Sequence, residues 1–382
     1  MNQFWILSRS VHLLFILLLL IPGLFAIAGC CGGLADERIE SLDRTVFPEH
    51  VWHRTYPAEH GINDGNVEAA IQHIEQITGE LGASKVVLVR NGYVIWQGED
   101  AEVMTSVWSC TKSFMSSVLG LLWDDGLLEP GDLAAKFEPG LETQYPEVTL
   151  EHLGTFTSGL DYEEGGLEPK SPRFPVGEAF HYSSESNLLA KILTRVAERP
   201  IAEVFRQRIA GPIGIDDASM TWGQVGEVDG LAINGGSGPP PGGIRINALA
   251  MARFGWLMAN EGVWDGERLL SQRYVDYATR PRTSPSTPPF DPQGWYVSLP
   301  GNYGLNWWTN GPQPDGSLRW PSAPRGMFAA QGNRDSVCFI IPEWDMVLVR
   351  LGEDKVIEMS EYDKVFELLN PAHQHMNQPS SP

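Results

Sequence analysis

Two β-branched stretches at opposite ends of the sequence set the strongest limit on the fold. The segment KVVLVRNGYVIWQG (85–98) holds two short runs separated by Asn91-Gly92, a pair that accepts positive φ at both central positions of a type I′ hairpin turn. The segment SVCFIIPEWDMVLVRLG (336–352) predicts a second hairpin, with its turn around Pro342 to Asp345. The two ends of the chain therefore predict matching parts of one antiparallel sheet.

Helical periodicity flanks and separates these hairpins. Apolar residues recur at three-and-four spacing in 65–81, and a closing helix is expected over 354–370. Between the hairpins, 187–198 and 247–262 predict helices, broken by Gly- and Pro-rich loops such as NGGSGPPPGGIR. We therefore expect an α+β fold, an antiparallel β-sheet flanked by helices with a mostly α-helical inserted region.

The same patterns divide the chain into consecutive parts with different roles. We expect a signal peptide over 1–29, an irregular N-terminal segment over 31–63, an α/β sheet region made of 64–130 plus 290–371, a mostly helical region over 131–289, and a disordered tail over 372–382.

The N-terminus has the pattern of an export signal. Arg9 precedes an apolar stretch, Leu13 to Ile21, that small residues follow. Ala26-Ile27-Ala28 suits a soluble signal-peptide cut, whereas Ile27-Ala28-Gly29-Cys30 resembles a bacterial lipobox with Cys30 lipidated, which we favour. An uncleaved membrane anchor is the third reading, although Pro22 interrupts the stretch. We expect an exported protein, periplasmic or attached to the cell envelope.

Charge and cysteine content narrow the partners and the source of stability. The formal net charge of −21 disfavours nucleic acid, which is bound through clustered Lys and Arg. Beyond the export signal only Cys110 and Cys338 remain, so the fold does not rest on a disulfide framework. A bridge between these two is conceivable but disfavoured, because Cys110 lies within the polar motif described next.

A polar tetrapeptide, Ser109-Cys110-Thr111-Lys112, begins an otherwise apolar run in SVWSCTKSFMSSVLGLLWDDGLL (106–128). On a helix over 108–123, Ser109 and Lys112 would share one face, with Cβ atoms about 5 to 6 Å apart. A lysine whose pKa is lowered by burial can take the proton of a serine hydroxyl and so create a nucleophile. The alternative is a serine N-cap followed by an exposed lysine, and the S-x-x-K pattern needs further elements to carry a function.

Two further segments offer such elements. Tyr182, in FPVGEAFHYSSESNLLAKIL (174–193), can relay a proton, or it can simply anchor the helix that follows. Ala330-Gln331-Gly332, before the C-terminal hairpin, can present a backbone amide to a carbonyl oxygen, or it can be an ordinary loop.

In combination, these motifs resemble the serine β-lactamase-related hydrolases, which include class C β-lactamases, D-Ala-D-Ala carboxypeptidases, esterases and 6-aminohexanoate-dimer hydrolases. The matching segments are SCTK, VTLEHLGTFTSGLDY (148–162), PVGEAFHYSS (175–184), GGIRINALAMARFGWLMANEGVWDGERLLS (242–271), YGLNWWTNG (303–311) and the strand from Gly332 to Pro342. The resemblance implies an active site in the cleft between the sheet and the helical region. It also implies a Ser109 acyl-enzyme with Lys112 and Tyr182 as acid/base partners, and an oxyanion hole made by the N–H of Ser109 and one at the strand of Gln331 and Gly332.

Departures from the class C pattern bear on the substrate. Tyr182-Ser183-Ser184 stands where that group has Tyr-x-Asn, and Ala330-Gln331-Gly332 stands where it has Lys-Thr-Gly. The missing lysine would hold a substrate carboxylate, so its absence argues against efficient penicillin hydrolysis and D,D-carboxypeptidation. Arg334 is a candidate replacement for that cation, with an exposed loop arginine as the alternative reading.

We therefore expect a serine hydrolase acting on a small ester or amide, without a metal or organic cofactor. A β-lactamase or D,D-carboxypeptidase acting on cell-wall-like peptides is the first alternative, and a non-catalytic ligand-binding relative is the second. Candidate residues of the substrate cleft are Trp307, Trp308, Ser184 and Arg334, although the two tryptophans suit a core equally well.

Overall fold

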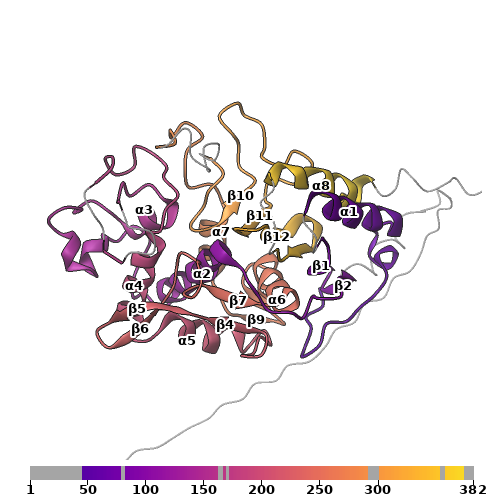
Figure 1. Ribbon diagram of the computed structural model, residues 1–382, viewed down its shortest axis with the longest axis horizontal. Helices are drawn as coiled ribbons and strands as arrows, with labels where there is room; N and C mark the ends of the chain where they lie inside the picture. The colour runs from indigo at the N-terminus through magenta and orange to yellow at the C-terminus, as the bar shows by residue number, and fades with distance from the viewer. Residues whose placement is uncertain are drawn as a thin grey trace, which may run out of the picture. The chain divides into compact units, whose positions relative to one another are not determined.

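Antiparallel pairing joins both ends of the chain into one sheet in the computed structural model, which describes residues 45–78, 82–161, 167–168, 172–290, 301–352 and 358–373. The strand order is β10-β11-β12-β13-β1-β2 (Figure 1). The strands are β1 Val86–Arg90, β2 Tyr93–Gln97, β10 Trp308–Thr309, β11 Phe328–Gly332, β12 Ser336–Ile341 and β13 Met346–Arg350. Both predicted hairpins are confirmed, and Asn91 and Gly92 have φ of +52° and +84° at the first turn.

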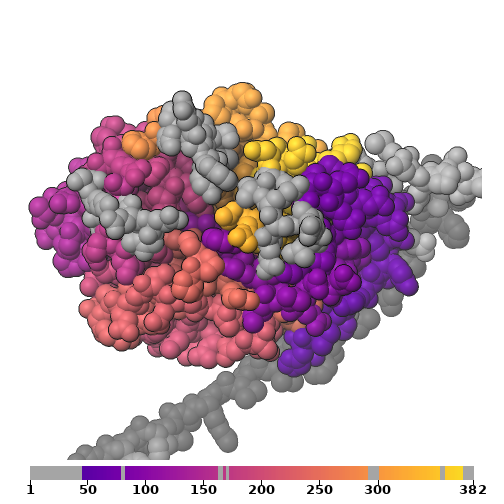
Figure 2. Space-filling view, viewed as in Figure 1, coloured from indigo at the N-terminus to yellow at the C-terminus, as the bar shows by residue number. Residues whose placement is uncertain are grey.

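Helices cover both faces of this sheet. Alternate residues of a strand point to opposite faces, so Leu348 of β13 belongs to one buried cluster and its neighbour Val347 to the other. The first cluster also holds α1 (Asp64–Ile77) and α8 (Asp363–Leu369), which pack side by side (Figures 1 and 2). The second cluster holds α6 (Ala248–Ala259). The observed α8 is shorter than the predicted helix over 354–370, because a 3-10 turn, η7 (Met359–Tyr362), precedes it.

Helix α2 (Thr111–Asp124) lies in the interior, between β11 and the helices of the middle region. All of its residues from Thr111 to Leu122 are buried, as expected for a helix that is apolar on most sides. Two of its buried serines donate to carbonyl oxygens of the loop before β10: Ser113 to Asn306 at 2.8 Å and Ser116 to Leu305 at 2.6 Å. Hydrogen bonding of this kind allows polar side chains inside the core.

The middle of the chain combines the predicted helices with small sheets that its sequence does not signal. Its helices are α3 Leu150–Thr155, α4 Ser186–Ala197, α5 Ile201–Phe205 and α7 Gln272–Ala278, with a π-helical turn, η5 Arg206–Ala210. Its strands pair as β3-β7-β4 (Thr105–Ser106, Ile244–Ile246, Met220–Trp222), β5-β6 (Gln224–Val228, Leu231–Asn234) and β8-β9 (Val263–Trp264, Glu267–Arg268). Short 3-10 turns are η1 Pro57–His60, η3 Ala134–Lys136, η4 Pro139–Leu141, η6 Pro342–Trp344 and η8 Pro371–His373. Strands this short show too few alternations for a pattern to reveal them.

The predicted export signal, with Cys30, lies outside the described residues, as does most of the predicted tail. Across the ranges that are described, no helix has the length and apolar character needed to cross a membrane. The division into a sheet region and a helical region stays a prediction.

Candidate active site

Ser109 lies in a tight turn directly before the buried helix α2. The turn is a 3-10 helix, η2 (Trp108–Cys110), and α2 begins at Thr111 rather than at the predicted residue 108. Trp108 has a φ of +49°, a left-handed conformation that bulky residues rarely adopt. The Ser109 hydroxyl donates to the carbonyl oxygen of Ser237 at 3.3 Å. Strained backbone of this kind is frequent at functional sites, where the surrounding structure enforces it.

Lys112, in the first turn of α2, meets Ser109 as the spacing predicts. Its Nζ lies 3.0 Å from Ser109 Oγ and 2.7 Å from the carbonyl oxygen of Ser237. The residue is only 2% exposed, and burial lowers the pKa of Lys112 to about 7, against a smaller raising effect of Cys110. An amine with this pKa is neutral in a large fraction of molecules at neutral pH. It can therefore accept the proton of the Ser109 hydroxyl.

The ring of Tyr182 closes this site from the other side. The Nζ of Lys112 lies 4.8 Å from the centroid of the Tyr182 ring. On the tyrosine's flanks, Trp308 stacks with centroids 5.5 Å apart and planes inclined by 21°, and Phe156 lies 4.5 Å away. The backbone before Tyr182 is held by a 2.8 Å bond from the amide of His181 to the carbonyl of Phe156. The three predicted side chains therefore come together, although Tyr182 belongs to a segment distant in sequence from Ser109 and Lys112.

The second acceptor for Lys112 belongs to a loop that the sequence does not mark as part of the site. Asn187 of α4 accepts bonds from the amides of Gly236 at 3.0 Å and Ser237 at 2.9 Å, and Ser237 Oγ donates to the carbonyl of Ser184 at 2.9 Å. These bonds direct the Ser237 carbonyl at Lys112 Nζ. The contact uses a backbone oxygen, so no residue type marks it, and the Gly-rich composition of the loop was the one available signal.

The end of strand β11 reaches the backbone of the turn η2, which carries Ser109. A side-chain carbon at Gly332 would lie 2.1 Å from the carbonyl oxygen of Val107 and 3.1 Å from the amide nitrogen of Ser109, so only glycine fits there. The neighbouring Gln331 is 7% exposed, and its side-chain Nε2 has no hydrogen-bond partner among the described residues. The predicted strand edge therefore lies beside the Ser109 amide.

A protein-family model described as Beta-lactamase matches residues 67–364, which is most of the chain. The chain belongs to the beta-lactamase family. It is accordingly a serine hydrolase of that family, and the predicted fold class is confirmed.

Individual relatives of this beta-lactamase-family hydrolase differ in their named activities. It is 22% identical over 336 residues to the 6-aminohexanoate-dimer hydrolase of Paenarthrobacter ureafaciens, spanning 78% of this chain and 79% of the relative. The solved structure of EstCE1, described as a hydrolase with promiscuous acyltransferase activity, matches with a TM-score of 0.60 at 16% identity, over 80% of this chain and 99% of that one. D-alanine carboxypeptidase AmpC from Burkholderia cenocepacia matches with a TM-score of 0.57 at 17% identity, over 81% of this chain and 100% of that one. At such identities the structural matches establish the fold.

The remaining candidate residues of the hydrolase lie in different places. Trp307 is a core residue, because its ring stacks on Phe254 and its Nε1 donates to Tyr274 Oη at 3.5 Å. Trp308 is buried too, but it supports Tyr182 directly. Arg334 is exposed, and its guanidinium lies over the ring of Trp108, 5.6 Å from the centroid. Trp108 directly precedes Ser109 in the sequence.

Both cysteines of the described chain are buried and free, so the conceivable bridge is not formed. Burial raises the pKa of the Cys110 thiol well above its usual range, and Cys110 Sγ donates to the carbonyl of Ser336 at 3.2 Å. In the ranges that are described, no cluster of His, Cys, Asp and Glu is arranged to hold a metal ion. Cys110 is thus held as a neutral thiol beside Ser109.

Proposed function

We propose that the hydrolase cleaves a small ester or amide through an acyl-enzyme formed on Ser109. The observation that carries the proposal is the buried amine of Lys112, with a pKa of about 7, at 3.0 Å from the hydroxyl of Ser109. A serine hydroxyl is a weak nucleophile until an adjacent base removes its proton. The ring of Tyr182 has its centroid 4.8 Å from the same amine, and we take its phenol hydroxyl as a second group able to carry a proton in this site.

In the proposed reaction, Ser109 Oγ attacks the substrate carbonyl carbon while its proton passes to the coupled pair of Lys112 and Tyr182. The negative charge that develops on the carbonyl oxygen is stabilised by the amide of Ser109 and by an amide of the strand end after Gly332. The same pair then protonates the leaving alcohol or amine, and the carbon–oxygen or carbon–nitrogen bond breaks. In the second half-reaction the same pair takes a proton from water, whose oxygen attacks the acyl carbon. The bond from that carbon to Ser109 Oγ then breaks, the proton passes to Oγ, and the acid is released.

The strand edge supports an ester or amide substrate over a β-lactam. Ala330 occupies the place of the lysine that would pair with a β-lactam carboxylate, whereas the side-chain amide of the buried Gln331 has no partner in the described part of the chain and is available as a donor. Arg334, over the ring of Trp108, is proposed as the cation that meets an anionic part of the substrate. The named activity of the 6-aminohexanoate-dimer hydrolase supports amides as one substrate class.

The test compares purified protein on a short-chain nitrophenyl ester, a small linear amide and a chromogenic cephalosporin, with a fluorophosphonate probe to mark the nucleophile. We expect kcat/KM to be higher for the ester than for the cephalosporin, and the probe to map to Ser109. Faster turnover of the cephalosporin would support the β-lactamase alternative. A folded protein that neither reacts with the probe nor hydrolyses any of the three would support the non-catalytic alternative.

Tyr182→Phe should leave a folded protein whose kcat is reduced about 10²- to 10⁴-fold, the range that general acid–base groups contribute. The ring contacts with Trp308 and Phe156 survive the substitution, so the melting temperature should change little. Steady-state kinetics on the nitrophenyl ester and a thermal melt measure both effects.

Tyr274→Phe is the matched control. Its phenol is fully buried, whereas Tyr182 is only partly buried, and its hydroxyl donates to Ser116 Oγ at 2.9 Å inside the core. We expect this variant to lose about 1 kcal/mol of unfolding free energy and to keep its kcat. Unchanged kcat in Tyr182→Phe would remove Tyr182 from proton transfer.

A further inference from the structure

The turn between β11 and β12 adopts a costly backbone conformation. Its two central residues, Arg334 and Asp335, have φ of +59° and +57°, the left-handed region in which both centres of a type I′ turn lie. In the same sheet, the turn between β1 and β2 uses Asn91 and Gly92, the residue types suited to this geometry. Asp adopts this region more readily than most residues, but Arg is poorly suited to it, so contacts from outside the turn are needed to enforce the conformation at Arg334.

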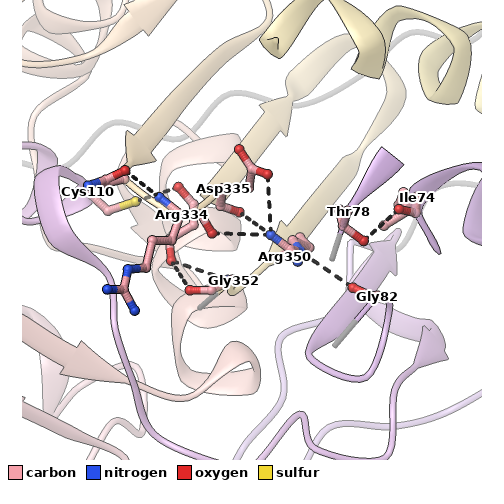
Figure 3. A network of polar contacts seen from close by, with 10 residues as sticks. Ile74, Thr78, Gly82, Cys110, Arg334, Asp335, Arg350 and Gly352 are labelled. Atoms are coloured by element: carbon pink, nitrogen blue, oxygen red, sulfur yellow. Dashed lines mark hydrogen bonds and ion pairs between the residues drawn. The ribbon is translucent and has the colours of Figure 1, made fainter. Parts of the chain in front are cut away.

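A buried arginine supplies those contacts (Figure 3). Arg350, the last residue of β13, is 0% exposed, and its Nη1 donates to the carbonyls of Arg334 at 3.2 Å and Asp335 at 3.4 Å. Its Nε donates to the carbonyl of Gly82 at 3.4 Å. The carboxylate of Asp335, 1% exposed, lies 3.7 Å from Nη1, within the range of an ion pair. One guanidinium therefore holds both left-handed residues of the turn.

Both flanks of this turn touch the segment that carries the nucleophile. On one side, Gly332 lies against the backbone of Val107 and Ser109 too closely for any side chain. On the other, the carbonyl of Ser336 accepts the thiol of Cys110 at 3.2 Å. A shift of the turn would therefore move backbone groups on the strand end that faces the amide of Ser109.

A stabilising role alone is a weak account of Arg350. Burying a charged pair costs desolvation that apolar residues of the same volume avoid, so an ion pair of this kind is poor evidence for a gain in stability. The planar guanidinium has several N–H donors in a rigid arrangement, so it can fix the positions of several carbonyl groups at once.

We propose that Arg350 is a positioning residue for the oxyanion-binding backbone of the active site, acting through the turn at Arg334 and Asp335. The proposal rests on the proposed Ser109 acyl-enzyme. It predicts that loosening the turn weakens the binding of the tetrahedral transition state more than the binding of the substrate, because only the former places a full negative charge at the strand end.

The experiment uses Arg350→Met and the more conservative Arg350→Lys, with Arg253→Met as the matched control. Arg253 is also a buried arginine, and it donates to the carbonyls of Pro48 and Ile213 at 3.1 and 2.8 Å, on a different part of the molecule. Each variant is assayed on the nitrophenyl ester, and inhibition by phenylboronic acid, which forms a tetrahedral adduct with a reactive serine, measures affinity for a transition-state mimic.

For Arg350→Met we expect kcat to fall about 10- to 100-fold, less than the loss of a whole oxyanion donor, with KM changed less than about threefold. The inhibition constant of phenylboronic acid should rise by a similar factor. Arg350→Lys should have a kcat and an inhibition constant between those of the parent and those of Arg350→Met. Arg253→Met should lower the melting temperature while kcat stays within about twofold of the parent.

Unchanged kcat and boronate affinity in folded Arg350→Lys, or equal losses of kcat in Arg350→Met and Arg253→Met, would overturn the proposal. If Arg350→Met does not fold, the kcat and the boronate affinity of Arg350→Lys test the proposal. A failure of the proposed function is recognised separately, because the parent protein would then show no fluorophosphonate labelling of Ser109.

Discussion

Ser109→Ala should lower kcat/KM for the nitrophenyl ester by at least about 10⁴-fold, because no acyl-enzyme can form without the hydroxyl. The side chain donates one 3.3 Å bond to the Ser237 carbonyl and accepts one from Lys112, so its loss removes little packing. The melting temperature should therefore stay near that of the parent. Ester hydrolysis measures kcat/KM, fluorophosphonate labelling with peptide mapping identifies the reactive serine, and a thermal melt gives the melting temperature.

Ser117→Ala is the control for this substitution. Ser117 belongs to the same buried helix, but its hydroxyl bonds to the carbonyl of Phe114 within that helix at 2.6 Å. We expect Ser117→Ala to keep its probe labelling and its turnover. Labelling of Ser109→Ala at the parent's rate would place the reactive serine elsewhere and would remove the basis of the mechanism.

The parts of the site that could be predicted are those encoded by local spacing. Ser109 and Lys112 are three residues apart, and one helical turn brings them together whatever the rest of the chain does. The two hairpins were likewise predictable, because the turn at Asn91-Gly92 and the apolar runs around Pro342 carry their own signals. Local structural preferences of this kind are observed in the folded protein because the tertiary contacts favour the same conformations.

What could not be predicted depends on contacts between distant segments. The acceptor for Lys112 is a backbone oxygen at Ser237, 125 positions along the chain, placed there by the side chain of Asn187. Trp307 and Trp308 are adjacent and chemically identical, yet one stacks in the core on Phe254 and the other supports Tyr182. Trp307 is the last residue before strand β10 and Trp308 is the first residue within it, and a strand of only two residues is too short for a sequence pattern to reveal.

Lys112→Met should nearly abolish turnover across the whole pH range, while the parent's kcat/KM should rise with an apparent pKa near 7. The amine can accept a proton only when neutral, and burial lowers the pKa of Lys112 to about 7. Lys112→Arg separates charge from basicity, because arginine stays protonated and cannot take the serine proton. Both variants should lose at least about 10³-fold in kcat/KM at pH 8; retained activity in Lys112→Arg would exclude the lysine as a base.

Lys112→Met should also raise the free energy of unfolding, and the size of this gain should depend on pH. A folded pKa of about 7 lies below the unfolded value of 10.5, so between these values the unfolded chain binds a proton that the folded one lacks. The parent's unfolding free energy therefore gains up to about 1.4 kcal/mol per pH unit from this group as the pH rises through that window, and the full cost of the buried charge is present below it.

Lys112→Met has no such cost, so its advantage in unfolding free energy should be largest below pH 7 and should shrink toward pH 10. Loss of the bonds to Ser237 and Ser109 offsets part of the gain, which leaves on the order of 2 to 3 kcal/mol at pH 6. Urea titrations of parent and variant at pH 6, 8 and 9.5 measure the difference and cancel the other groups that titrate in this range. A variant less stable than its parent at pH 6 would mean that the amine is well solvated in the folded protein, and a solvated amine cannot be the base that activates Ser109.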